Sequence, residues 1–143
     1  MDQNLHFLTI ATADLEAARA FYTTAMGWTP QLDVPGEIIF YPVAPGLLLG
    51  LFDAAKFNED LGLGEDRSSV SGLTLAHNVG SPEEVRSLAA AMEAAGATVL
   101  KSPRPGAFGG VFHALVQDPN HVIWEIAHNP GWHVDEDGTI HLS

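Results

Sequence analysis

Hydrophobic and polar positions in the first part of the chain predict a strand followed by a helix. Bulky and small residues alternate over 7–11, as they do in a strand with one buried face. Asp14 is suited to the N-cap of a helix, and Gly27 is suited to the position that ends one. One face of the helix between them would be apolar, formed by Leu15, Ala18, Phe21 and Tyr22.

Three more strands are expected after this helix, over 29–33, 37–43 and 46–53. Proline–glycine pairs at 35–36 and 45–46 separate them and are typical of turns. The order is therefore strand, helix, and three strands. An acidic stretch follows, about 54–70, which we expect to be an irregular linker.

The same order returns in the second half of the chain. A strand is expected over 73–79, and Ser81-Pro82-Glu83-Glu84 is a capping box that should begin a helix running to Ala95. The remaining strands are expected over 98–101, 111–117 and 122–128. Repetition of a whole supersecondary pattern is stronger evidence for a fold than any single element.

These elements predict an α+β fold made of two tandem βαβββ modules, about 5–53 and about 71–128, within a single domain of 1–143. The tail, 129–143, would follow the second module. Each module alone would leave one sheet face bare. We therefore expect curved mixed sheets around a central cavity, which is a natural place for a ligand.

Composition narrows the range of partners. The chain has 18 acidic residues against 6 basic ones, a formal net charge of -12, and this disfavours nucleic acids and anionic membranes as partners. The absence of cysteine excludes disulfides and thiolate metal sites. No apolar stretch is long enough to cross a bilayer, and the N-terminus lacks the features of a signal peptide. We therefore expect a cytoplasmic protein.

Two segments carry a family resemblance. HFLTIATADLEAARAFYTTAMGW has an Asp-Leu pair before a helix that ends in Phe-Tyr and then Gly, and VQDPNHVIWEIAHNP has an Asp-Pro-Asn turn before an apolar strand containing Glu. The first resembles the opening strand and helix, and the second the closing hairpin, of the vicinal oxygen chelate (VOC) superfamily. This superfamily contains glyoxalases, bleomycin-resistance proteins and dioxygenases. The resemblance covers about residues 5–130.

The resemblance also implies where a metal ion would be held. Metalloenzymes of the family bind one divalent ion with two side chains from each module. The matching positions here are Phe7, Gly50, Thr74 and Glu125, of which only Glu125 is a good ligand. A divalent cation needs several nitrogen or oxygen donors, so we expect no metal ion there. A strand slip of one residue, placing His6 at the first position, is the main alternative.

Glu125 is the leading candidate for a functional residue because it projects from an otherwise apolar strand. Such a carboxyl group can serve as a catalytic acid or base, or anchor a ligand. A structural hydrogen bond across the sheet is the alternative. The expected ligand-binding residues are Phe7, Gly50, Phe52, Thr74, Phe108, Phe112, His113 and Glu125.

The position of His113 depends on the hairpin between the last two strands. A simple hairpin closed by Asp118 and His121 would pair Ala114 with Glu125 and put His113 on the other face, and a bulge would reverse this. Phe108 lies in a glycine-rich loop that could gate a cavity.

Two functions of different classes remain open. The first is a binding protein that holds a small apolar or aromatic molecule in a metal-free pocket, as bleomycin-resistance members of the family do. The alternative is a glyoxalase- or dioxygenase-like enzyme that uses Glu125 as a base or a differently placed divalent metal such as Zn, Ni, Mn or Fe. The resemblance also implies a homodimer, because two-fold pairing is common in the family.

Overall fold

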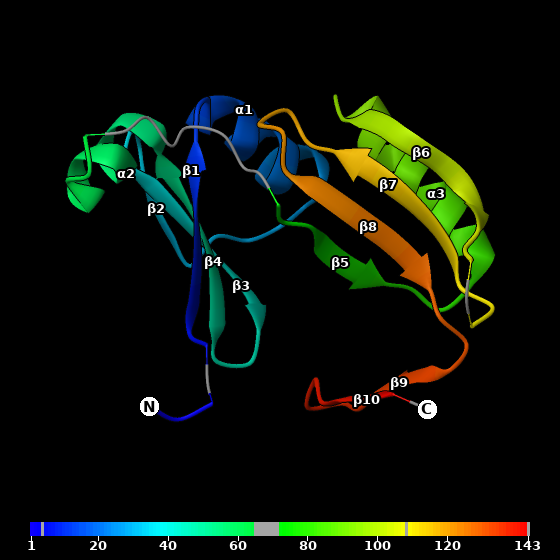
Figure 1. Ribbon diagram of the computed structural model, residues 1–143. Helices are drawn as coiled ribbons and strands as arrows, with labels where there is room; N and C mark the ends of the chain where they lie inside the picture. The colour runs from blue at the N-terminus through cyan, green and yellow to red at the C-terminus, as the bar shows by residue number, and fades with distance from the viewer. Residues whose placement is uncertain (4, 65–71, 108, 143) are drawn as a thin grey trace. The chain divides into compact units, whose positions relative to one another are not determined.

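The computed structural model describes residues 1–3, 5–64, 72–107 and 109–142. The chain forms two compact units, Met1–Ser71 and Gly72–Ser143, which correspond to the first and second modules. Each contains a four-stranded mixed sheet (Figure 1). The predicted α+β class is therefore confirmed.

The first module begins with a strand and a helix whose last turns widen into a π-helix. Its elements are β1 (Phe7–Thr12), α1 (Leu15–Arg19), η1 (Ala20–Ala25), β2 (Leu32–Val34), β3 (Ile38–Ala44), β4 (Leu47–Asp53) and α2 (Ala54–Leu61). The strand order in the sheet is β1-β4-β3-β2. Strand β1 runs parallel to β4, and the other neighbours are antiparallel.

The second module repeats this plan. Its elements are β5 (Leu75–Asn78), α3 (Pro82–Ala94), β6 (Thr98–Pro105), β7 (Phe112–Gln117), β8 (Ile123–His128), β9 (Trp132–Val134) and β10 (Ile140–Leu142). The sheet order is β5-β8-β7-β6, again with one parallel pair, and β9 and β10 form a separate hairpin. The duplication expected from the sequence is present strand for strand.

The predicted helix starts are confirmed by their hydrogen bonds. The carboxylate of Asp14 accepts from the backbone N–H of Ala17 at 2.9 Å. The hydroxyl of Ser81 accepts from the N–H of Glu84 at 3.2 Å, and the Glu84 carboxylate accepts from the N–H of Gly80 at 3.1 Å. These bonds satisfy N–H groups that have no partner within the helix.

The expectation of an irregular linker is wrong for its first half, which is helix α2. Asp53 caps it by accepting from the N–H of Lys56 at 3.1 Å, and Gly62, at φ +64°, ends it in the left-handed conformation. Asp53 and Gly62 indicate the start and the end of a helix, but the acidic composition of the segment favoured a linker. Strand β6 also extends four residues beyond its expected end at Lys101.

One face of each sheet is buried against its own helix. In the first module that face consists of Ile39, Tyr41, Leu49 and Leu51, packed beside Phe21 and Tyr22. In the second it consists of Ala114, Val116, Trp124 and Ile126, and it packs against α3, whose buried residues are Val85, Ala89 and Met92. Figure 1 shows α3 lying along one side of this sheet. These apolar positions recur every second residue in the strands, as a buried sheet face requires.

Charged side chains link helix to sheet differently in the two modules. In the first, Arg19 pairs with Asp33 on β2 at 2.6 Å, and this guanidinium lowers the pKa of the Asp33 carboxyl group. In the second, the guanidinium of Arg86 lies over the ring of Phe112, 4.5 Å from its centre. Burial raises the pKa of the Tyr41 phenol, and the hydrogen bond with Thr23, at 2.9 Å, partly offsets this rise.

Candidate functional site

The hairpin between β7 and β8 sets the geometry of the candidate site. The N–H of His121 donates to the carbonyl of Asp118 at 3.1 Å, and the N–H of Asp118 donates to the carbonyl of Val122 at 2.9 Å. His121 has φ +70°, in the left-handed region. This is a three-residue connection in which a type I turn is followed by a left-handed residue. The buried Asp118 carboxylate stabilises it by accepting from the N–H groups of Asn120 and Val122, each at 2.8 Å.

This turn shifts the strand register by one residue from the simple hairpin considered above. Glu125 lies opposite Leu115, not opposite Ala114, and His113 lies opposite Ala127, not opposite Ile126. The simple pairing was therefore wrong, and the bulge is the alternative that applies. Because side chains alternate faces along a strand, His113 and Glu125 lie on the same face.

His113 and Glu125 form a close pair. The Nδ1 atom of His113 is 2.7 Å from Oε1 of Glu125, and the two side chains are 16% and 35% exposed. They lie on the side of the β5-β8-β7-β6 sheet opposite α3, which we call the site face. On β7 and β8 it carries His113, Leu115, Gln117, Ile123, Glu125 and Ala127. Within the described residues, His Nε2 and Glu Oε2 form no hydrogen bond. Nε2 of His113 can therefore donate or accept, and Oε2 of the Glu125 carboxylate can accept, a hydrogen bond with a bound molecule.

Three of the predicted residues gather in the first module. Phe7, Gly50 and Phe52 lie on the sheet face opposite the one buried against the helix, together with Phe40. We call this the aromatic face. Phe7 is 51% exposed, and the edge of its ring meets Phe40 with the ring centres 5.5 Å apart. A Cβ atom added to Gly50 would lie 2.9 Å from Cε1 of Phe40, so the phenyl ring fills the space above this glycine.

The other predicted residues are separated from one another. Thr74 is exposed and lies directly before β5, two residues from Ala76, which pairs with Glu125. Phe112 lies on the helix side of β7, under Arg86, and so faces away from Glu125. Phe108 lies outside the described residues.

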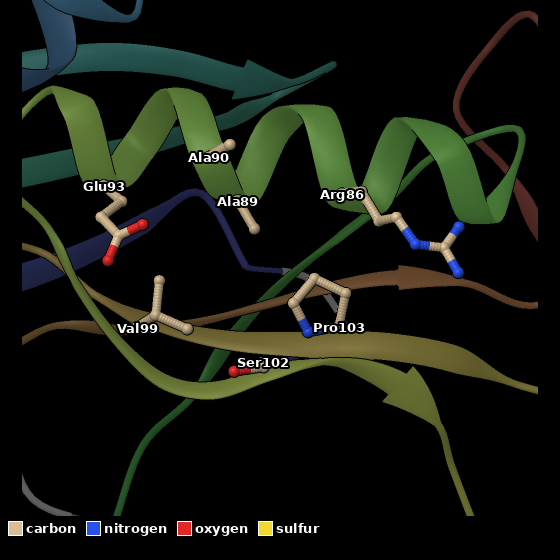
Figure 2. A pocket seen from close by; sticks show the side chains of 7 residues that line it. All are labelled: Arg86, Ala89, Ala90, Glu93, Val99, Ser102 and Pro103. Carbon is tan, nitrogen blue, oxygen red and sulfur yellow. The ribbon is translucent and has the colours of Figure 1, made fainter.

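A second feature is a hollow of about 320 Å³ between α3 and β6 (Figure 2). It lies on the helix side of the sheet, because Val99 in its lining pairs with the buried Val116. Arg86 and Glu93 lie toward opposite ends of it, and Arg86 already pairs with Glu83 at 3.0 Å. The hollow brings no reactive groups together, so the His113–Glu125 pair is the stronger candidate.

Comparisons with known proteins agree with this fold. A sequence model of the Glyoxalase/Bleomycin resistance protein/Dioxygenase superfamily matches residues 4–126. The chain belongs to this superfamily. It is similar in structure to a glyoxalase-related enzyme from Fulvimarina pelagi, with 35% sequence identity, a TM-score of 0.89, and 99% of each chain covered.

Two further members of the superfamily share the fold. A glyoxalase/bleomycin resistance protein/dioxygenase from Nocardioides is 27% identical, with a TM-score of 0.72 over 92% of this chain and 87% of that one. A family enzyme from Burkholderia phytofirmans PsJN is 25% identical, with a TM-score of 0.73 over 87% and 98%. A search of curated proteins found no match. None of the described helices is long and apolar enough to span a membrane.

The residues at the four metal-ligand positions that the resemblance implies do not fit a divalent ion. Phe7 has no donor atom, and Phe40 occupies the space that a side chain at Gly50 would need. Thr74 offers one hydroxyl group, and Glu125 is already engaged by His113. Across the described parts of the chain, no group of three or more His, Asp or Glu side chains is arranged to hold a metal ion. One carboxylate and one hydroxyl are too few donors for Zn²⁺ or a similar ion.

Proposed function

We propose that this protein binds a small, largely apolar or aromatic molecule on the site face, without a metal ion, through Glu125 and His113. The observation that carries this proposal is the 2.7 Å contact between the two side chains, beside the apolar residues Leu115, Ile123 and Ala127 of the same face. The mode of binding that we propose is that of the bleomycin-resistance type of the superfamily. The drug itself is not implied.

The physical case rests on the cost of polar groups on an apolar surface. Removing water from a carboxylate and an imidazole raises the free energy unless the two groups find new hydrogen-bond partners. Here they satisfy each other at one atom each and retain one free polar atom each, Oε2 and Nε2. A ligand that covers Leu115 and Ile123 would exclude water and strengthen its hydrogen bonds to these atoms. The pair therefore suits a ligand with an apolar body and one polar group.

A second function, metal-free proton transfer, is favoured by one detail of the same contact. Glu125 meets His113 at Nδ1, which orients the imidazole and leaves Nε2 available to accept a proton from a substrate. In this alternative His113 would be the general base and Glu125 the group that positions it. Turnover of a bound molecule by the parent protein, lost on changing His113 to Gln, would favour this enzyme over a binding protein.

Replacing Glu125 tests the binding proposal. Glu125→Gln keeps the shape of the side chain and removes its charge, so we expect the fold to persist. Native mass spectrometry of protein purified without a tag identifies the small molecule that stays bound. The binding free energy of that molecule, measured by calorimetry, should weaken by about 1–3 kcal/mol, the scale of a charge-assisted hydrogen bond. Glu93→Gln, an acid on the helix side of the same module, is the matched control.

Two outcomes would count against this proposal. If Glu125→Gln lowers the melting temperature but leaves binding intact, Glu125 is only a structural partner. If the untagged protein contains one Zn, Ni, Mn or Fe per chain, and loses it in Glu125→Gln, binding is not metal-independent. The same spectra give the oligomeric state, for which a homodimer remains our prediction.

A further inference from the structure

Some basic residues of this acidic chain form ion pairs with carboxylates, and others do not. Of the Lys and Arg residues that the structure describes, Arg19 binds Asp33, Lys56 lies 3.6 Å from Glu37, and Arg86 binds Glu83. The remaining two, Lys101 and Arg104, form no ion pair with any described carboxylate. With 18 acidic residues against 6 basic ones, potential partners are abundant. Two unpaired cations three residues apart are therefore unexpected.

Both cations belong to the site face. On β6, Lys101 lies opposite Leu115 and Arg104 lies opposite His113. Directly opposed residues on neighbouring strands share a face, so both point to the side that carries Glu125. Residues three apart in a regular strand would lie on opposite faces. The two irregularities in β6, between Val99 and Lys101 and between Lys101 and Arg104, permit this arrangement.

The strand pairings arrange these side chains in two rows across the sheet. One row runs Lys101, Leu115, Glu125, and the other runs Arg104, His113, Ala127. Adjacent strands are about 5 Å apart, so Lys101 and Glu125 stand about 10 Å apart at the backbone, with Leu115 between them. The face thus has a cationic edge on β6, Leu115 and His113 side by side on β7, and Glu125 on β8.

We propose that the ligand of the site face is a small organic acid whose carboxylate is held by Arg104 and Lys101. This inference rests on the function proposed above and specifies its ligand class. Arg104 donates through Nε to the carbonyl of Ser102 at 3.1 Å, which holds its side chain. Its terminal nitrogens have no partner among the described residues, and a guanidinium edge matches a carboxylate. The acid's apolar body then covers Leu115, and a polar group at its far end meets His113 and Glu125.

Three probes with one skeleton test the charge requirement: 4-hydroxyphenylacetate, its neutral amide, and the cationic amine tyramine. Each offers the same ring and hydroxyl group, and only the group meant for β6 differs. We expect the parent protein to bind the acid about tenfold more tightly than the amide, equivalent to roughly 1.4 kcal/mol, and the amine most weakly. Titration followed by NMR at constant ionic strength measures all three.

Variants identify the residues responsible. In the double variant Lys101→Gln/Arg104→Gln, affinity for the acid should fall to that of the amide, while affinity for the amide should not change. Arg86→Gln is the matched control, because it removes a positive charge from the helix side of the same module. It should leave the preference for the acid intact. Circular dichroism verifies that each variant is folded.

Several results would overturn the inference, and they separate it from the proposed function. If acid and amide bind equally well and Glu125→Gln weakens both, the site is correct and the acid is not its ligand class. Equal loss of acid binding in Arg86→Gln and in the double variant would show a general charge effect, not a site. If none of the three probes binds the parent protein, the inference fails, and the retained molecule alone tests the proposed function.

Discussion

The two modules bury the same positions and differ on the faces they leave unburied. Leu49 and Leu51 of β4 correspond to Trp124 and Ile126 of β8, and all four are buried against a helix. On the other face the correspondence ends. Gly50 beneath Phe40 occupies the place that Glu125 beside Leu115 holds in the second module.

This difference separates folding from function. The helix-side positions must be apolar in both modules because they form the core, and a polar group there would lose water without gain. The opposite faces carry no such requirement, and one is aromatic whereas the other carries a His–Glu pair. Chemistry is therefore expected in the second module, while the aromatic face of the first offers only shape and apolar area.

The largest effect should come from placing a side chain at Gly50. In Gly50→Ala, the new Cβ would lie 2.9 Å from Phe40 and 3.3 Å from the hydroxyl of Thr9, so we expect the free energy of unfolding to fall by about 1–3 kcal/mol. Urea denaturation measures this change. Combining Gly50→Ala with Phe40→Leu should recover most of the loss, with Phe40→Leu alone as the control. A Gly50→Ala protein as stable as the parent would show that Phe40 does not close this position.

The hairpin turns provide a second, smaller contrast. The first module has Gly46 at φ +74° between β3 and β4, whereas the second has His121 at φ +70° between β7 and β8. His121→Gly should raise the free energy of unfolding by roughly 0.5–1 kcal/mol, because relief of left-handed strain exceeds the added chain entropy of glycine. Gly46→Ala should lower it by about 1 kcal/mol. Urea denaturation of both variants measures whether each free energy of unfolding rises or falls. Destabilisation by His121→Gly would mean that the histidine side chain itself supports the turn.

The smallest effect should come from removing the ion pair between Arg19 and Asp33, which links helix to sheet in the first module. The pKa of Asp33 is lowered in the folded state by Arg19, so its contribution to stability is present above the ordinary pKa of an aspartate and is lost as pH falls through the lowered value. Asp33→Asn should cost less than about 1 kcal/mol at pH 7, as expected for a partly exposed ion pair. The difference in melting temperature between the two proteins should hold down to the ordinary pKa of an aspartate and shrink as the pH falls from there through the lowered value. A difference that does not shrink in this acid range would show that the ion pair is not its cause.

Much of the fold could be predicted because its signals are local. Asp14 and Ser81 act through hydrogen bonds to residues three positions on, and the repeated order of elements needs no long-range contact to be recognised. Helix α2 had local signals too, in Asp53 and Gly62, but its acidic surface resembled a solvated linker. The sequence therefore contained enough information to predict α2, although we expected an irregular linker there.

Only one of the two residues of the candidate pair could be predicted from the sequence. Glu125 could be singled out because a lone acid in an apolar strand is conspicuous. Its partner His113 could not be assigned, because the face depends on the strand register, and a shift of one residue reverses every side chain. The register in turn depends on His121 adopting a left-handed conformation that most residues other than glycine avoid.

The sequence by itself determined the elements, their caps, the duplication and the family, because each depends on residues close together along the chain or on a motif. Tertiary structure alone decided which side chains meet. The ring of Phe40 closes over Gly50, and Lys101 and Arg104 reach the face of His113 and Glu125, only through pairings between strands distant in sequence. Those pairings are set by turns and bulges whose backbone angles the pattern of hydrophobic residues does not encode.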